Sequence, residues 1–387
     1  MSKPGRRDFI KTLGAAIAGI AVGGAAGGYV AGSQARDRIE SLEKELKEAK
    51  EKLLGVEKLE KEVRVYNFEA YIHPYINTLF EETTGTKVIY DVFEATDECL
   101  AKFTTGGGGY DIVVFTGGTI PISDYEEYAQ PLDHSKIPNV MKYIFDELKN
   151  PAYDPRRKFT APYQSGTSGI TYNTVRIDEE DHPEGWLDSL FDFDHFLPKY
   201  KGKCTMIPGG VETIPNVIKG ALGHSINDLR PEIVEEAVQL MIKQKPYLAT
   251  YAGTEEYITG LEAERFWCSE TWSYLGARPT CEYVVPVEGC EIWTDNMVVP
   301  KNPPHLNAAY AWINFISEPT VQAAITIYNG GYMTPNKRAF EMLPEDMQTD
   351  EAIYPPSEVL AKLEPWEGRT PEQRQMLTEA WSRIMAA

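Results

Sequence analysis

The alternation of short apolar strands with helices between residues 64 and 115 constrains the fold most. Pro74 stands in the first turn of the first predicted helix and Gly85 follows its end, which are typical start and stop signals. The third strand is apolar throughout, as a buried parallel strand should be. This β-α-β-α-β order predicts an open α/β sheet, whose ligands bind beyond the carboxyl ends of the strands. The predicted elements are strands 64–68, 87–91 and 110–115 and helices 73–83 and 96–103.

The stretch Glu291–Pro300 predicts a further strand, because it combines Ile, Trp, Thr and a Val pair before a proline. Side chains alternate along a strand, so Trp293 and Asp295 should share a face. An indole beside a carboxylate suits an organic cation, since the ring face attracts the charge and the acid balances it. The alternative is a tryptophan packed in a core and an aspartate that faces water at a strand end.

The charge of the chain argues against nucleic acid as a partner. Residues 1–63 carry 12 Lys/Arg and 10 Asp/Glu, whereas the remaining 324 residues carry 26 and 48, a balance of -22. A surface that acidic repels phosphate backbones and attracts cations. Overall charge cannot separate this role from acidity that only keeps a protein in solution.

The N-terminus predicts an export signal. Arg6 and Arg7 lie in a twin-arginine pattern, and residues 13–32 form an apolar run rich in Ala and Gly. The run is about long enough to span a bilayer. Residues 1–33 are therefore predicted as a twin-arginine signal that is either cleaved or kept as a membrane anchor, without a cysteine for a lipid anchor. The protein would be periplasmic or at the cell surface.

Residues 34–63 predict a charged helical stalk between the signal and the globular body. Leucines and other apolar residues recur there at 3-4 spacing among Glu and Lys, as in a coiled coil. The pattern spans under three heptads and Gly55 interrupts it, so a lone solvated helix and a dimer both remain open. We predict a monomeric body.

The cysteines and histidines show no pattern of a metal or catalytic site. No pair of the five cysteines has C-x-x-C spacing, and the six histidines form no H-x-x-x-H or H-E-x-x-H motif. Cys281 and Cys290 flank a predicted hairpin turn at 286–289, where a disulfide and two free packed thiols are both possible. We predict no catalytic residue, no metal and no cofactor.

The chain changes character between Tyr163 and Asn173, where small and polar residues suit a crossover into a second lobe. Helix 307–317 and the segment 332–336 should then return to the first lobe. The second lobe is predicted to contain helices 186–197, 231–244 and 254–262, a helix ending near Gly223, and strands 204–207 and 265–268.

With these pieces in order, the chain resembles the spermidine/putrescine-binding proteins of polyamine ABC importers, within the type 1 extracellular solute-binding proteins. The resemblance covers about residues 64–385. It implies a two-lobed, periplasmic-binding-protein-like α/β clamshell with crossing hinge strands, here with lobe 1 at 64–168 and 295–340 and lobe 2 at 169–294 and 341–387. The matching segments are Tyr66–Tyr71, Tyr110–Val114, Ile292–Asp295, Gly331–Asn336 and Pro365–Glu367.

The resemblance also implies a ligand site. Asp295 matches the central carboxylate that binds an ammonium, and Glu212 matches a carboxylate at a terminal amine. Four positions depart from the family: Gly209 replaces an aspartate, Phe68 a tryptophan, Glu69 a threonine and Gly118 a bulky aromatic residue. The ligand-binding residues implied are Phe68, Glu69, Tyr71, Thr116, Glu212, Trp267, Trp293, Asp295, Tyr332 and Glu367.

The function implied is that of a non-catalytic exported protein that delivers a polyamine to ABC permease and ATPase subunits. Which polyamine or other organic cation fits is left open, because the site loses one carboxylate and gains others. Three alternatives remain: a membrane-tethered sensor on the stalk, a hydrolytic enzyme that uses Glu212 and Asp295 as acid and base, and a binder of ferric iron or an anion.

Overall fold

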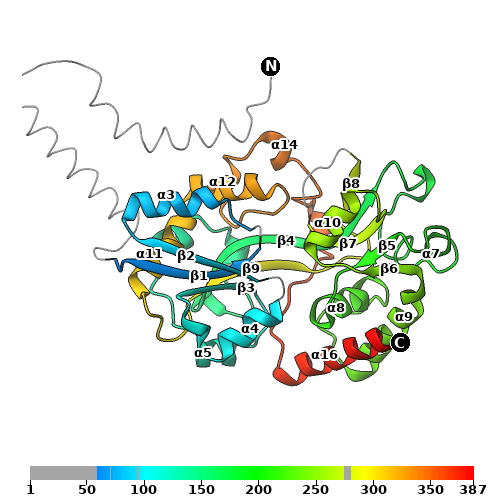
Figure 1. Ribbon diagram of the computed structural model, residues 1–387, viewed down its shortest axis with the longest axis horizontal. Helices are drawn as coiled ribbons and strands as arrows, with labels where there is room; N and C mark the ends of the chain where they lie inside the picture. Colours follow the sequence, from blue (N-terminus) through cyan, green and yellow to red (C-terminus); the bar gives the residue numbers. More distant parts are fainter. Residues whose placement is uncertain (1–58, 70, 94–95, 274–279) are drawn as a thin grey trace, which may run out of the picture.

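The computed structural model describes residues 59–387 except 70, 94–95 and 274–279. The predicted twin-arginine signal and nearly all of the predicted stalk lie outside the described residues. From residue 59 onward the chain forms two α/β lobes (Figure 1).

The first three strands form the parallel sheet that the sequence predicts. β1 (Glu62–Phe68) pairs in parallel with β2 (Lys87–Phe93) and with β3 (Ile112–Thr116). The connecting helices are α3 (Pro74–Thr84) and α4 (Thr96–Thr104), and α3 begins and ends as its Pro and Gly signals predict.

Two long strands cross from one lobe to the other. β4 (Thr160–Asn173) and β9 (Ile292–Val298) pair with each other along residues 160–167. β9 also pairs antiparallel with β3, and β4 continues into the sheet of the second lobe, so the strand order is β2-β1-β3-β9-β4-β7-β5-β6. The predicted crossover at 163–173 and the predicted strand at 291–300 are therefore confirmed.

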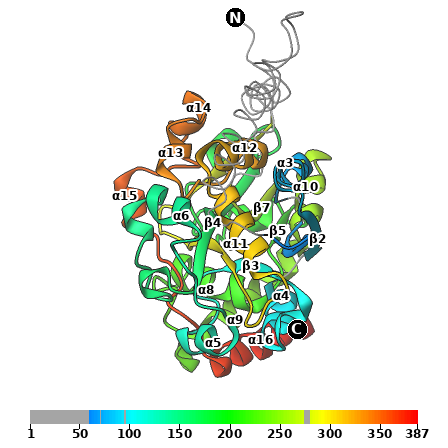
Figure 2. The ribbon, with the colours of Figure 1, turned by 90° about the vertical axis from the view of Figure 1, so that its left-hand side faces the viewer.

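Lobe 1 buries both faces of its sheet. One face packs against α3 and α11, and the other packs against α4 and α5. Figure 2 shows α3, α12, α13 and α14 at one end of the molecule and α4 and α5 toward the other. The further helices of this lobe are α5 (Ile122–Tyr128), α6 (Pro138–Tyr143), α11 (Leu306–Ile316), α12 (Pro319–Asn329), α13 (Lys337–Phe340) and α14 (Glu345–Gln348).

Lobe 2 has a separate core around α8, α9 and α16. The predicted helices 231–244 and 254–262 are present with the same bounds. Its strands are β5 (Cys204–Met206), β6 (Leu248–Tyr251), β7 (Cys268–Trp272) and β8 (Cys281–Val284). Its helices are α7 (Phe196–Lys199), α8 (Gly210–Gly220), α9 (Pro231–Gln244), α10 (Thr254–Glu262), α15 (Ser357–Leu360) and α16 (Pro371–Ala386).

Two predicted elements of lobe 2 are wrong. Residues 186–195 form turns instead of a helix, because Asp192 accepts the backbone N–H groups of residues 194–196 and competes with helical bonds. The strand predicted at 265–268 begins only at Cys268. Arg265 and Phe266 instead donate their backbone N–H groups to Gly260 at the end of α10.

The predicted hairpin is also wrong. Gly289 closes a turn by donating its N–H to the Pro286 carbonyl at 2.9 Å, but β8 and β9 both pair antiparallel with β4 and so run in the same direction. Cys281 and Cys290 are buried thiols, and no disulfide joins them.

A third segment crosses between the lobes near the C-terminus. Trp366 lies so close to the β3–α5 loop that a Cβ added at Gly118 would fall 2.3 Å from its carbonyl oxygen. The bounds of the two lobes remain a prediction. Leu343 shares a small core with Ala323 and Ala339, and Tyr354 packs on Phe340, so residues 341–354 belong by their packing with lobe 1.

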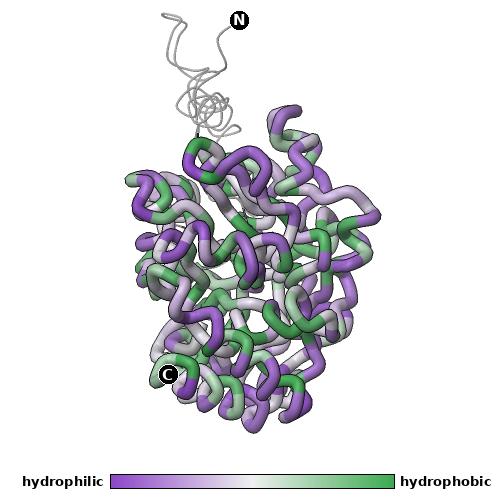
Figure 3. The backbone as a smooth tube through the Cα atoms, turned by 90° about the vertical axis from the view of Figure 1, so that its right-hand side faces the viewer, coloured by the Kyte–Doolittle hydropathy of each residue, from purple (hydrophilic) through white to green (hydrophobic). Residues whose placement is uncertain are grey.

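Hydrophobic and hydrophilic stretches alternate along the outer helices (Figure 3). Within the described part of the chain, the structure contains no helix with the length and apolarity needed to cross a membrane.

Candidate functional site

Asp295 is the centre of the candidate site, on β9 where this strand passes between the lobes. Its side chain is 5% exposed. Thr116 lies opposite it on β3 and donates its hydroxyl to Asp295 Oδ1 at 2.7 Å, while the Tyr71 hydroxyl donates to Oδ2 at 2.7 Å. Burial raises the pKa of the Asp295 carboxyl to about 6, although the two hydroxyl bonds oppose that shift.

Aromatic rings surround this carboxylate. The Tyr332 ring lies 5.3 Å from the Tyr71 ring and 5.3 Å from the Trp293 ring, edge to face in both cases. Phe68, half-buried at the end of β1, packs 5.7 Å from Tyr71. Trp293 lies against Gly166 of β4, where an added Cβ would fall 2.3 Å from the indole, so only glycine leaves room for it.

Glu212 faces this region from lobe 2, in the first turn of α8. Its Oε1 accepts a hydrogen bond of 3.0 Å from the hydroxyl of Thr96, which belongs to α4 of lobe 1. The acid therefore lies where the two lobes meet. Gly209, which precedes α8, has a φ of 116°, a conformation that a side chain rarely adopts.

The structure does not bring Trp267 to these residues. Its indole N–H donates to the Glu264 carbonyl at 2.8 Å, and its ring packs on Tyr200 in the core of lobe 2. Trp272, at the other end of β7, instead packs against the lobe 1 core that contains Tyr71, Trp293 and Tyr332. Strand β7 begins only after Trp267, and its other end carries Trp272 toward lobe 1.

Glu69 and Glu367 are exposed and lie at the surface of the chain. The Glu69 backbone N–H donates to the Phe93 carbonyl at 3.2 Å, and that of Glu367 donates to Asn227 Oδ1 at 3.2 Å. The structure fixes these two residues through their backbone.

Gln164 is a candidate that the sequence analysis missed. It pairs with Asp295 across β4 and β9, just as Thr116 does across β3 and β9, so the three side chains form one row. Its carboxamide is fully buried, and neither its nitrogen nor its oxygen has a hydrogen-bond partner among the described residues. An amide in this state is a natural partner for a polar guest beside Asp295.

Two buried glutamates were also missed, although the sequence carries their signal. Glu270 and Glu291 each stand two residues before a tryptophan, Trp272 and Trp293, on the same face of their strands. Glu270 is 0% exposed and Glu291 is 2% exposed. Burial raises the pKa of both carboxyls, that of Glu270 to about 8.

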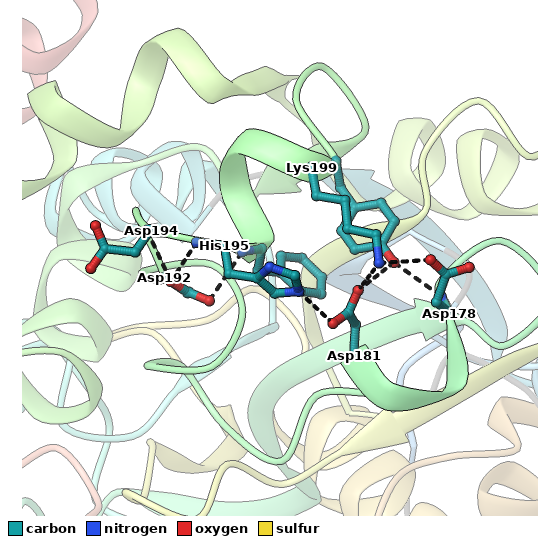
Figure 4. Close-up of polar contacts among 8 residues, drawn as sticks. Asp178, Asp181, Asp192, Asp194, His195 and Lys199 are labelled. Atoms are coloured by element: carbon teal, nitrogen blue, oxygen red, sulfur yellow. Dashed lines mark hydrogen bonds and ion pairs between the residues drawn. The ribbon is translucent and has the colours of Figure 1, made fainter.

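A second polar cluster lies far from this region, beside α7 in lobe 2 (Figure 4). Asp181 accepts hydrogen bonds from Lys199 Nζ at 2.6 Å and the Tyr200 hydroxyl at 2.8 Å, and His195 Nε2 lies 2.7 Å from its other oxygen. Lys199 Nζ also lies 2.6 Å from Asp178. Asp178, Asp181 and Lys199 each have a partner of the opposite charge within the chain.

The site at the lobe junction thus combines carboxylates, aromatic rings and hydroxyl groups. Such a set recognises a cation, since acids balance its charge and rings attract it. Among the residues that the structure describes, no three His, Cys, Asp or Glu side chains are arranged to hold a metal ion.

Comparison with known proteins gives a consistent result. Residues 77–355 match the family of bacterial extracellular solute-binding proteins. A putrescine/agmatine-binding protein of Pseudomonas aeruginosa is 26% identical over 336 residues, which cover 83% of this chain and 91% of that protein.

Solved structures agree with that match. A putative spermidine/putrescine ABC transporter protein from Listeria monocytogenes is 30% identical with a TM-score of 0.76, over 84% of this chain and 99% of that one. A spermidine/putrescine ABC transporter substrate-binding protein from Streptococcus pneumoniae is 32% identical with a TM-score of 0.70, over the same shares of the two chains.

Proposed function

The chain belongs to the bacterial extracellular solute-binding proteins, and on that premise we propose that it binds a polyamine outside the cytoplasm and delivers it to an ABC importer. Its partners would be the permease and ATPase subunits of that importer. Relatives named for putrescine, agmatine, cadaverine and spermidine support this substrate class.

The observation that carries the proposal is the state of Asp295. This acid is buried, and among the described residues no Lys, Arg or His forms an ion pair with it. An unpaired buried charge is unfavourable by several kcal/mol, so an ammonium group that arrives between Asp295 and the surrounding rings is strongly favoured. An anion would meet the repulsion of this acid and of Glu212.

We assign the ligand contacts accordingly. Asp295, Thr116 and Tyr71 would hold one ammonium group, and Glu212 would face the guest from lobe 2. We assign to Trp272 the ring contact that the resemblance implied for Trp267, because the Trp272 ring reaches the junction of the lobes. The remaining predicted contacts, at the edge or wall of the site, are Phe68, Glu69, Trp293, Tyr332 and Glu367.

Export by the twin-arginine route, with residues 1–33 either cleaved or kept as a membrane anchor, completes the proposal. Family membership supports a role as a binding protein rather than an enzyme, and the location of the relatives supports a place outside the cytoplasm.

Isothermal titration calorimetry tests the proposal. The full chain, freed of bound amines by partial unfolding and dialysis, is titrated with putrescine, agmatine, cadaverine and spermidine, and with glutarate as an anionic control of similar length. We expect binding of at least one amine and none of glutarate. The proposal would be refuted if none of the amines gave heat of binding, or if glutarate alone did.

A further inference from the structure

The sequence E-x-W occurs five times, and two of the copies belong to strands of the sheet: Glu270–Trp272 on β7 and Glu291–Trp293 at the start of β9. In both, the acid stands two residues before the indole, the spacing of side chains on one strand face. β7 carries the first copy into the junction of the lobes, where Trp272 packs against the core of lobe 1. Glu270 therefore lies directly inward of this ring, toward the interior of lobe 2.

The surroundings of Glu270 are built from polar groups. The Ile207 backbone N–H donates to one carboxyl oxygen at 3.2 Å, and Asn216 Nδ2 donates to the other at 3.3 Å. Both donors come from the segment that leads into α8 or from α8 itself, the helix that also carries Glu212. The charge of Glu212 is near enough to raise the pKa of the Glu270 carboxyl further, after burial, which is the larger cause.

The other titratable groups near Glu270 come from three elements. Tyr251 lies on β6, Tyr283 on β8 and Cys290 just before β9, and the negative charge of Glu270 acts on each of them. All three groups have pKa values raised far above neutrality by burial. Among the described residues, none of the groups known to face Glu270 is a cation.

A buried cation, Arg369, lies in this region. Arg369 is 2% exposed and feels the charges of Glu291 and Glu212. It stacks on Trp366 at 3.7 Å and donates one N–H to the Val211 carbonyl, yet its Nε and Nη2 atoms have no partner among the described residues. Arg369 acts on Glu291 but is not among the groups that act on Glu270, so a cation that arrives beside Glu270 is favoured.

We propose that Glu270 acts with Glu212 as the acid pair that binds the ammonium group at the lobe 2 end of the guest, which selects an α,ω-diamine over a monoamine. This inference rests on the proposed function. Asp295 holds one ammonium group and the glutamate pair holds the other. When the second ammonium arrives, the O–H bond of the Glu270 carboxyl breaks and its proton leaves to water. The ammonium keeps its own protons and donates an N–H hydrogen bond to the new carboxylate.

The experiment compares two variants and two ligands. Glu270→Gln keeps the size and the acceptor oxygen but removes the charge. Glu282→Gln removes an exposed acid from β8 of the same lobe and is the matched control. The full chain and both variants are titrated calorimetrically with putrescine and with n-butylamine. Titration in phosphate and in Tris at about pH 8 counts the protons released, since these buffers differ in ionisation heat.

We expect Glu270→Gln to weaken the binding of putrescine by about tenfold or more and the binding of n-butylamine by less than about twofold. The unchanged protein should release about half a proton per putrescine at about pH 8, and Glu270→Gln should release none. Asp295 does not contribute at that pH, because its carboxyl is already ionised. Glu282→Gln should match the unchanged protein in every respect.

Several outcomes overturn the inference. If the unchanged protein binds putrescine but Glu270→Gln binds it equally well, Glu270 is a structural acid. If Glu270→Gln does not fold, the proton count of the unchanged protein decides, and no release at about pH 8 overturns the inference. If the unchanged protein binds no amine, the proposed function itself fails, which is a separate result.

Discussion

Two buried aspartates in this protein have opposite environments. Asp295 is 5% exposed and Asp181 is 7% exposed, so burial disfavours the charge of both. At Asp181 that effect is outweighed by hydrogen bonds from Lys199, Tyr200 and His195, which lower the pKa of the carboxyl to about 2. At Asp295 only two hydroxyl groups oppose it, and the pKa rises to about 6.

The difference separates a structural acid from a binding acid. Asp181 obtains its counter-charge from Lys199 on α7 and thereby fixes the turns around residues 178–200. Asp295 has hydrogen bonds but no counter-charge among the residues that the structure describes, so a cation that arrives from outside improves its free energy. Mutations at the two positions should therefore affect different properties.

The largest effect is expected for Asp295→Asn. Loss of this charge should weaken amine binding by about 2–5 kcal/mol, or roughly 30-fold to several thousandfold, because the guest's ammonium loses its buried counter-charge. The midpoint of thermal unfolding without ligand should stay the same or rise, since a buried unpaired acid is removed. Calorimetry and thermal unfolding measure the two properties. A variant with a lowered midpoint and full affinity would reverse the comparison.

Asp181→Asn should show the opposite pattern. Loss of the charged hydrogen bonds should lower the free energy of unfolding by about 1–3 kcal/mol, while amine affinity stays unchanged. The folded pKa of Asp181 lies below the unfolded value of about 3.9, so this stability is present above about pH 4 and is lost as the pH falls toward 2. Denaturant unfolding at several pH values checks this, and a constant gap between variant and unchanged protein would contradict it.

The pH dependence of n-butylamine binding should follow Asp295, because this monoamine is not expected to engage Glu270. Its folded pKa of about 6 exceeds the unfolded value of about 3.9, so its charged form destabilises the ligand-free protein above about pH 6, and that effect fades as the pH falls toward 4. The affinity for n-butylamine should change in the opposite direction, with a loss of up to about tenfold per pH unit below 6. Asp181→Asn should keep this dependence and Asp295→Asn should lose it. A flat affinity between about pH 7 and 5 in the unchanged protein would contradict the prediction.

The smallest effect is expected at the tryptophans. Trp272→Ala should weaken amine binding by about 0.5–2 kcal/mol, because one aromatic face of the site is lost. Trp267→Ala should leave affinity unchanged and lower the midpoint of thermal unfolding, since this ring packs on Tyr200 and Cys268 lies in the same core. Paired titrations and unfolding curves separate the two. Loss of affinity in Trp267→Ala alone would restore the original prediction.

Much of the fold could be predicted because its signals are local. Pro74 and Gly85 bound α3 correctly, and helices 231–244 and 254–262 have the predicted ends. The errors arose where side chains or the carbonyl groups at a helix end accept hydrogen bonds from the backbone. The Asp192 carboxylate accepts backbone N–H groups where a helix was predicted, so turns form there. The Gly260 carbonyl accepts the backbone N–H groups of Arg265 and Phe266, which therefore do not join the predicted strand. Neither competition shows in a hydrophobic pattern.

The sequence by itself determined the α/β architecture, the crossing strand and the shared face of Trp293 and Asp295, because periodicity along one strand or helix decides such features. Only the tertiary structure decided that Trp272 rather than Trp267 reaches the junction and that Gln164 lies beside Asp295. It also decided that Asp181 has a cationic partner, whereas Asp295 has none within the described part of the chain. These facts depend on strand register and on contacts between residues more than 100 positions apart, such as Tyr71 with Asp295. Burial and counter-charge are set by those distant neighbours, so no stretch of sequence contains them.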